Sequence, residues 1–79
     1  MTPDEIEAVK HVAHAIDVKE EIFEQIDSLD DVVDCIVNQP GVNMEKLGEV
    51  VKANAGEGAK LGNTKAKRVR QLIKFALGD

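Results

Sequence analysis

The chain has 79 residues, a single cysteine, no Trp or Tyr, and a net charge of −5. This length fits one domain with a thin core, and the lone Cys35 excludes the internal disulfides on which small secreted domains depend. No apolar run approaches the length of a membrane span and no signal-peptide pattern is present, so we expect one domain over residues 1–79 in the reducing cytoplasm.

The first predicted helix begins at Thr2, because Thr2 and Glu5 form a capping box with Pro3 at the first helical position. Its apolar stripe consists of Ile6, Val9, Ala13 and Ile16. Asp17 is expected to end this helix and to cap a short second one over residues 19–26, since D-V-K-E is again a capping box.

Two further helices follow, each after a strong N-cap. Ser28 caps the first of them, which stops at the N-Q-P-G sequence of residues 38–41 because proline disfavours helix at the residue before it. Asn43 caps the next one. Gly48 lies inside that helix, where glycine is unfavourable, and therefore indicates a close helix crossing.

A glycine-rich segment, residues 54–62, is predicted to be a flexible loop before the last helix. That helix covers residues 63–77, with Asn63 or Thr64 as its cap and Gly78 at its end. Its packing face consists of Val69, Leu72, Ile73 and Ala76, with Phe75 at the border of the polar face. No strand pattern is present, and the sequence predicts an all-α bundle of four to five short helices.

Charge is segregated along the chain. Residues 1–58 hold 14 acidic and 4 basic side chains, whereas residues 59–79 hold 6 basic side chains and 1 acidic one. This asymmetry indicates either a basic patch that faces a partner or attraction between the two parts of the chain. The predicted binding residues for nucleic acid or another partner are Lys60, Lys65, Lys67, Arg68, Arg70 and Lys74.

Residues 28–77 contain three predicted helices joined by segments with distinctive residues. A helix leads to a turn with Pro40 and Gly41, then to a helix with Leu47 and Gly48, and then to a helix that opens with Thr64. This pattern resembles the tri-helical cores of helix-turn-helix and winged-helix-like domains, which implies DNA binding through the last helix. The loop before that helix is longer than the turn of such domains, and a five-helix bundle gives the same pattern for packing reasons alone.

Other motifs do not indicate a catalytic or metal site. His11 and His14 form H-x-x-H without a second ligand pair, and the acidic residues 27–34 lack the D-x-D-x-D-G pattern of a calcium loop. Cys35 has the surroundings of a buried, inert thiol, and no nucleophile–base pair is suggested by spacing. We expect no enzyme activity, no metal and no cofactor.

Two functions remain. The first is a small nucleic-acid-binding regulator, of transcription if the helix-turn-helix resemblance holds, in which the basic C-terminal helix contacts phosphates or base edges. The second is an acidic protein–protein interaction module, such as an adaptor, inhibitor or assembly factor, without nucleic-acid binding. The net charge of −5 favours the second, and the basic segment favours the first. Homodimerisation stays open, because thin cores often gain buried area in this way.

Overall fold

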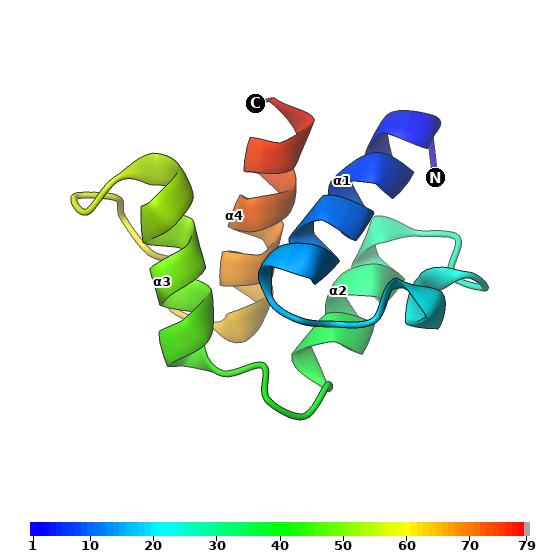
Figure 1. Cartoon of the computed structure of the whole chain (residues 1–79), viewed down its shortest axis with the longest axis horizontal. Coiled ribbons are helices and arrows are strands. Elements are labelled where there is room, and N and C mark those ends of the chain that lie inside the picture. The colour runs from blue at the N-terminus through cyan, green and yellow to red at the C-terminus, as the bar shows by residue number, and fades with distance from the viewer. Residues whose placement is uncertain (79) are drawn as a thin grey trace.

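A computed structural model describes residues 1–78 of the chain and shows a helical bundle (Figure 1). The elements in order are α1 (Pro3–Ala15), the 3-10 helix η1 (Glu20–Phe23), α2 (Leu29–Val37), α3 (Met44–Ala55) and α4 (Lys65–Leu77). The described residues contain no strand, which confirms the predicted all-α fold. Within this part of the chain, every helix falls short of the length and apolar character that crossing a bilayer requires.

Each α-helix begins at a residue whose side-chain oxygen accepts a hydrogen bond from a backbone N–H of the first turn. These N-caps are Thr2, Ser28, Asn43 and Thr64. At Thr2 the capping box is complete, because the Glu5 carboxylate also accepts a hydrogen bond of 2.8 Å from the Thr2 backbone N–H. The predicted starts of all four α-helices are therefore confirmed, with Thr64 as the cap of α4.

The predicted helix over residues 19–26 is wrong in length and in its cap. Only Glu20–Phe23 is helical, as a 3-10 turn, and its N-cap position is Lys19 without a side-chain hydrogen bond. Asp17 has a φ of 58°, a left-handed conformation that suits the turn after α1 but not an N-cap, which needs an extended backbone. Its carboxylate instead lies 2.8 Å from Nζ of Lys46 on α3.

The core lies around α4, which packs against α1, α2 and α3. Figure 1 shows α4 between α3 on one side and α1 and α2 on the other. The most buried side chains of α4 are Val69, Leu72 and Ile73, as its apolar pattern predicts. They meet aliphatic residues from each of the other α-helices, and Phe23 is the one buried aromatic residue among those described.

Two large apolar side chains lie outside this core. Ile6, which the sequence pattern places on the packing stripe of α1, is 39% exposed, and Phe75 is 36% exposed. The stripe of α1 reaches the core only from Ala8 onward, one turn later than predicted. Of the two phenylalanines, Phe23 is therefore part of the core and Phe75 is not.

The loop before α4 is shorter at its start than predicted. Residues 54 and 55 belong to α3, since alanine at positions 53 and 55 favours helix. The helix ends at Gly56, whose φ of 97° stops it without steric strain. The segment that connects α3 to α4 therefore begins at Gly56 and not at residue 54.

Candidate functional site

An open groove with a cationic lining runs between the polar face of α4 and the end of the loop before it. Its volume is about 570 Å³, and its charged lining residues are Lys60, Lys67, Arg70 and Lys74. We call this hollow, with these four cations in its lining, the basic groove. Asn63 and Gln71 add polar side chains, and no carboxylate lines the groove. Its chemistry therefore fits an anionic ligand.

Three of the four cations come from one helix face. Lys67, Arg70 and Lys74 lie at positions i, i+3 and i+7 of α4, which places them along about 10 Å of one edge. All three are exposed, because the opposite face of the helix carries the buried Val69 and Ile73. The predicted separation of α4 into a packing face and a cationic face is confirmed.

The fourth cation, Lys60, is placed beside α4 by Gln71. The Gln71 side-chain oxygen accepts a hydrogen bond of 2.8 Å from the backbone N–H of Gly62. Its Nε2 donates a hydrogen bond of 2.8 Å to the backbone carbonyl of Lys60. One side chain thus satisfies both a donor and an acceptor of the loop and fixes residues 60–62 along the helix. The sequence gives no signal for this role, since Gln71 is an ordinary polar residue on a polar face.

Arg68 lies outside the basic groove and joins three segments of the fold. It is half-buried, and its Nε donates a hydrogen bond of 2.7 Å to the carbonyl of Gly62. Its Nη1 donates to the carbonyl of Met44, in the first turn of α3. The guanidinium therefore bridges α4, the loop and α3, with its Nε and Nη1 donors both engaged within the protein.

Gly48 makes room for this bridge. A Cβ at position 48 would lie 2.8 Å from Nη1 of Arg68 and 3.3 Å from a methyl carbon of Leu61. The close approach predicted from Gly48 is therefore present, but the group that approaches is a guanidinium and not the backbone of a neighbouring helix. Lys65, the remaining predicted cation, is half-buried at the start of α4 and does not line the groove.

One cation of the basic groove is paired with the acidic side of the molecule. Nη2 of Arg70 lies 2.7 Å from Oδ1 of Asp30, at the start of α2. Both side chains are largely exposed, so solvent screens this pair. Among residues 1–78, no carboxylate lies within ion-pair distance of Lys60, Lys67 or Lys74. The acidic helices thus contact one edge of the groove and leave its other three cations uncovered.

The other sequence motifs are scattered in the structure. Nε2 of His14 lies 3.3 Å from the Glu20 carboxylate, whereas His11 faces α4. Cys35 is half-buried, with its backbone carbonyl accepting a hydrogen bond from Gln39. The described residues contain no group of three or more His, Cys, Asp or Glu side chains with the arrangement of a metal site.

Comparisons with protein-family models, with curated proteins and with solved structures give no match.

Proposed function

We propose that the protein is a non-enzymatic nucleic-acid-binding protein whose basic groove follows the phosphate backbone. The observation that carries this proposal is the convergence of four cations on one groove, three of them without an ion-pair partner among residues 1–78. Phosphate contacts supply most of the affinity of non-specific nucleic-acid binding and need no aromatic residues. The lack of exposed Trp and Tyr is thus compatible with this mode of binding.

The internal hydrogen bonds of the groove support the same proposal. Gln71 holds the Lys60 segment in place before any ligand arrives, so little loop entropy is lost on binding. Arg68 fixes the loop from its other side through the Gly62 carbonyl. Preorganised cations on a rigid helix position a phosphate backbone better than cations on a mobile tail.

If the resemblance to helix-turn-helix domains holds, α4 is the helix that enters the DNA groove. The protein would then act as a regulator of transcription.

The overall charge of −5 limits the affinity, because the acidic helices repel the same polyanion. Binding is therefore expected to be strongly salt-dependent. If each of the four cations neutralises one phosphate, the slope of log K against log salt concentration is about −3.6 for duplex DNA, from about −0.9 per phosphate.

The test is a titration of the chain against labelled duplex DNA, single-stranded DNA and duplex RNA at several salt concentrations. The groove variant K60Q/K67Q/K74Q removes the three unpaired lysines. The matched control K10Q/K19Q/K52Q changes the net charge equally, with lysines that lie outside the groove. We expect the groove variant to lose about three quarters of the salt slope, since one of four cations remains, and the control to keep it.

Equal losses for both triple variants would contradict a defined groove. Absence of binding to all three nucleic acids at low salt would contradict the proposal itself. The second function, an acidic protein-interaction module, would then be favoured by the net charge of −5. A comparison of R70E/K74E with D30K/D34K in partner capture would identify which charged face such a module uses.

A further inference from the structure

We propose that the nucleic acid held by the basic groove is single-stranded, and that one unstacked base enters an apolar hollow beside that groove. This inference rests on the proposed function and names the class of nucleic acid that the site takes. The hollow lies between α2 and α4, which pack against each other, and has a volume of about 210 Å³. We call it the α2–α4 hollow.

The α2–α4 hollow is lined by aliphatic side chains and by two cations. Its aliphatic residues come from both helices and are Leu29, Val33, Ile73 and Leu77. Val33 and Ile73 are buried, so the apolar lining is part of the core surface and already desolvated. Among residues 1–78, Arg70 and Lys74 are the only charged residues of the lining. A group that enters the hollow therefore has an apolar surface, and negative charge is favoured beside it.

Arg70 and Lys74 line both the α2–α4 hollow and the basic groove. The two depressions therefore adjoin at these side chains, whose Cα atoms are about 6 Å apart along the axis of α4. A phosphate held by either cation brings its own nucleotide to the edge of the apolar hollow. Lys60 and Lys67 line the basic groove alone and are thus placed to contact neighbouring phosphates of the same strand.

The size of the α2–α4 hollow indicates that its occupant is one group of a larger ligand. Pockets that bury a whole drug-sized ligand have volumes of about 300–1,000 Å³, which exceeds the 210 Å³ of this hollow. A group of this size needs further contacts next to the hollow to be held. The cations of the basic groove supply such contacts, and they select a ligand with an anionic group beside its apolar one.

The chemistry of the lining favours a base as this apolar group. Both faces of a nucleobase can be covered by apolar side chains, as in pockets that hold a flipped base. The planar guanidinium of Arg70 offers a further surface on which a base stacks. Its ion pair of 2.7 Å with Asp30 holds Arg70 at the junction of the two depressions before a ligand arrives. In a nucleic-acid strand each base is joined through its sugar to a phosphate, which matches the adjacent apolar and cationic surfaces.

The need for a free base selects single strands. In a duplex the bases are paired and stacked, and extruding one has a free-energy cost that is absent in an unpaired strand. A single strand also has a lower charge density than a duplex, so the acidic residues of segment 1–58 repel it less. This mode of binding differs from entry of α4 into a major groove, in which the bases stay paired.

The experiment titrates the full chain with three labelled DNA probes of about 12 nucleotides. They are a single strand, the same strand with abasic sites in place of its bases, and the strand annealed to its complement. We expect the intact strand to bind about five- to tenfold more tightly than the abasic strand. The salt slopes of these two strands should agree, because their phosphates are the same. At about 0.15 M salt the duplex should bind at least about threefold more weakly than the intact strand.

Two variants change the α2–α4 hollow without changing its charge. L29Q makes part of its lining polar, and I26Q, at another half-buried aliphatic residue outside both depressions, is the control. R70K keeps the positive charge but removes the planar guanidinium. L29Q and R70K should each lower the affinity for the intact strand at least about threefold more than that for the abasic strand, whereas I26Q should show no such difference. Circular dichroism checks that each variant keeps the fold.

Nuclear Overhauser contacts locate the base directly. We expect contacts between base protons of the bound single strand and methyl groups of Val33 or Ile73, which lie in the lining of the hollow. Contacts of base protons with other methyl groups alone would contradict the proposal. An acidic amphipathic peptide that shifts the amides of Leu29 and Val33, when the intact strand does not, would identify a protein segment as the occupant and overturn it.

Failure of this inference and failure of the proposed function give different results. Absence of binding of all probes at low salt would contradict both. Equal affinities of the intact and abasic strands, with a salt slope that K60Q/K67Q/K74Q reduces, would support the basic groove and overturn the entry of a base into the hollow. Equal losses in L29Q and I26Q would also overturn it.

Discussion

The Arg70 guanidinium lies 2.7 Å from the Asp30 carboxylate, so a cation of the basic groove is held by the acidic helix α2. The two residues are 40 positions apart in sequence, and both side chains are largely exposed. An exposed pair of this kind contributes about 0.2–1 kcal/mol. It therefore has little effect on stability, but it places a negative charge beside one of the cations that we propose to contact phosphate.

The first prediction follows from this pair. D30N should tighten nucleic-acid binding about two- to fivefold at low salt, because Arg70 is released and a repelling charge is removed. The control D34N removes the same charge from the same helix, away from the ion pairs of the structure. Titrations of both variants against duplex DNA measure the difference. Equal effects of D30N and D34N would show that only net charge matters.

The second prediction concerns the contact between Arg68 and Gly48. R68A should lower the free energy of unfolding by about 2 kcal/mol, because it leaves the carbonyls of Gly62 and Met44 without their donor. G48A should also destabilise the wild-type chain, since its Cβ would lie 2.8 Å from Nη1 of Arg68. In the R68A background that obstacle is absent, and G48A should be neutral or stabilising by up to about 1 kcal/mol from helix propensity.

Urea unfolding of the wild type, both single variants and the double variant gives this cycle. Additive effects of the two substitutions would contradict the proposed contact. R70A serves as a control for R68A, because its exposed ion pair predicts a loss below about 1 kcal/mol.

The third prediction concerns the hydrogen bonds of Gln71 to the loop. Q71A should raise the hydrogen-exchange rate of the Gly62 amide, since that N–H loses its acceptor at 2.8 Å. Nucleic-acid affinity should fall as well, because Lys60 is no longer held beside α4. Exchange at amides of α1 reports on global stability and should change less than exchange at Gly62. Unchanged exchange at Gly62 would show that Gln71 does not hold the loop.

The fourth prediction concerns pH. The hydrogen bond and charge of Lys46 hold the pKa of Asp17 below its ordinary value of 3.8. A carboxyl with a lower pKa in the folded chain than in the unfolded one stabilises the fold above pH 3.8. That contribution is lost as the pH falls through the folded-state value. D17N should therefore be less stable than the wild type near neutral pH, and the difference should vanish in acid.

Asparagine is the appropriate replacement at position 17, because it also adopts the left-handed conformation with φ of 58° that Asp17 has. Thermal unfolding of both proteins across the acid range measures the effect. A difference that persists below the folded-state pKa would mean that the charge of Asp17 is not its cause.

Local features of this fold could be predicted from the sequence, because they depend on near neighbours. Thr2, Ser28, Asn43 and Thr64 each act on an N–H within the next three residues, and spacing alone separates the two faces of α4. The sequence shows which basic residues are candidates for binding, but not which of them line one groove. The role of Arg68 depends on where Met44 lies, 24 residues away, which no local pattern contains.

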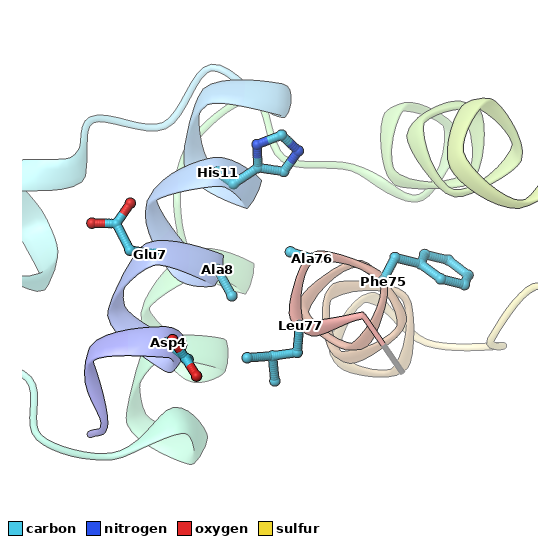
Figure 2. Close-up of a pocket in the computed structure, with 7 residues that line it drawn as sticks. All are labelled: Asp4, Glu7, Ala8, His11, Phe75, Ala76 and Leu77. Carbon is cyan, nitrogen blue, oxygen red and sulfur yellow. The ribbon is translucent and has the colours of Figure 1, made fainter.

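The same limit applies to Asp17 and to Phe75. D-V-K-E at Asp17 has the residues of a capping box, but the chain turns left-handed there and the carboxylate reaches Lys46, 29 residues away. Phe75 lies at the border of the helix wheel, and whether a border residue is covered depends on the neighbouring helices. In the structure its ring points away from α1 and stays partly exposed (Figure 2).

The central position of α4 has a consequence for how the chain acquires its structure during synthesis. The main packing of α1, α2 and α3 is against α4 and not against one another, and α4 follows all three in sequence. A nascent chain that has emerged only as far as residue 62 therefore has three amphipathic segments with exposed apolar faces and no common surface to pack on. Cooperative folding is therefore expected to wait until α4 leaves the ribosome, and the high negative charge of residues 1–58 opposes aggregation of the incomplete chain until then.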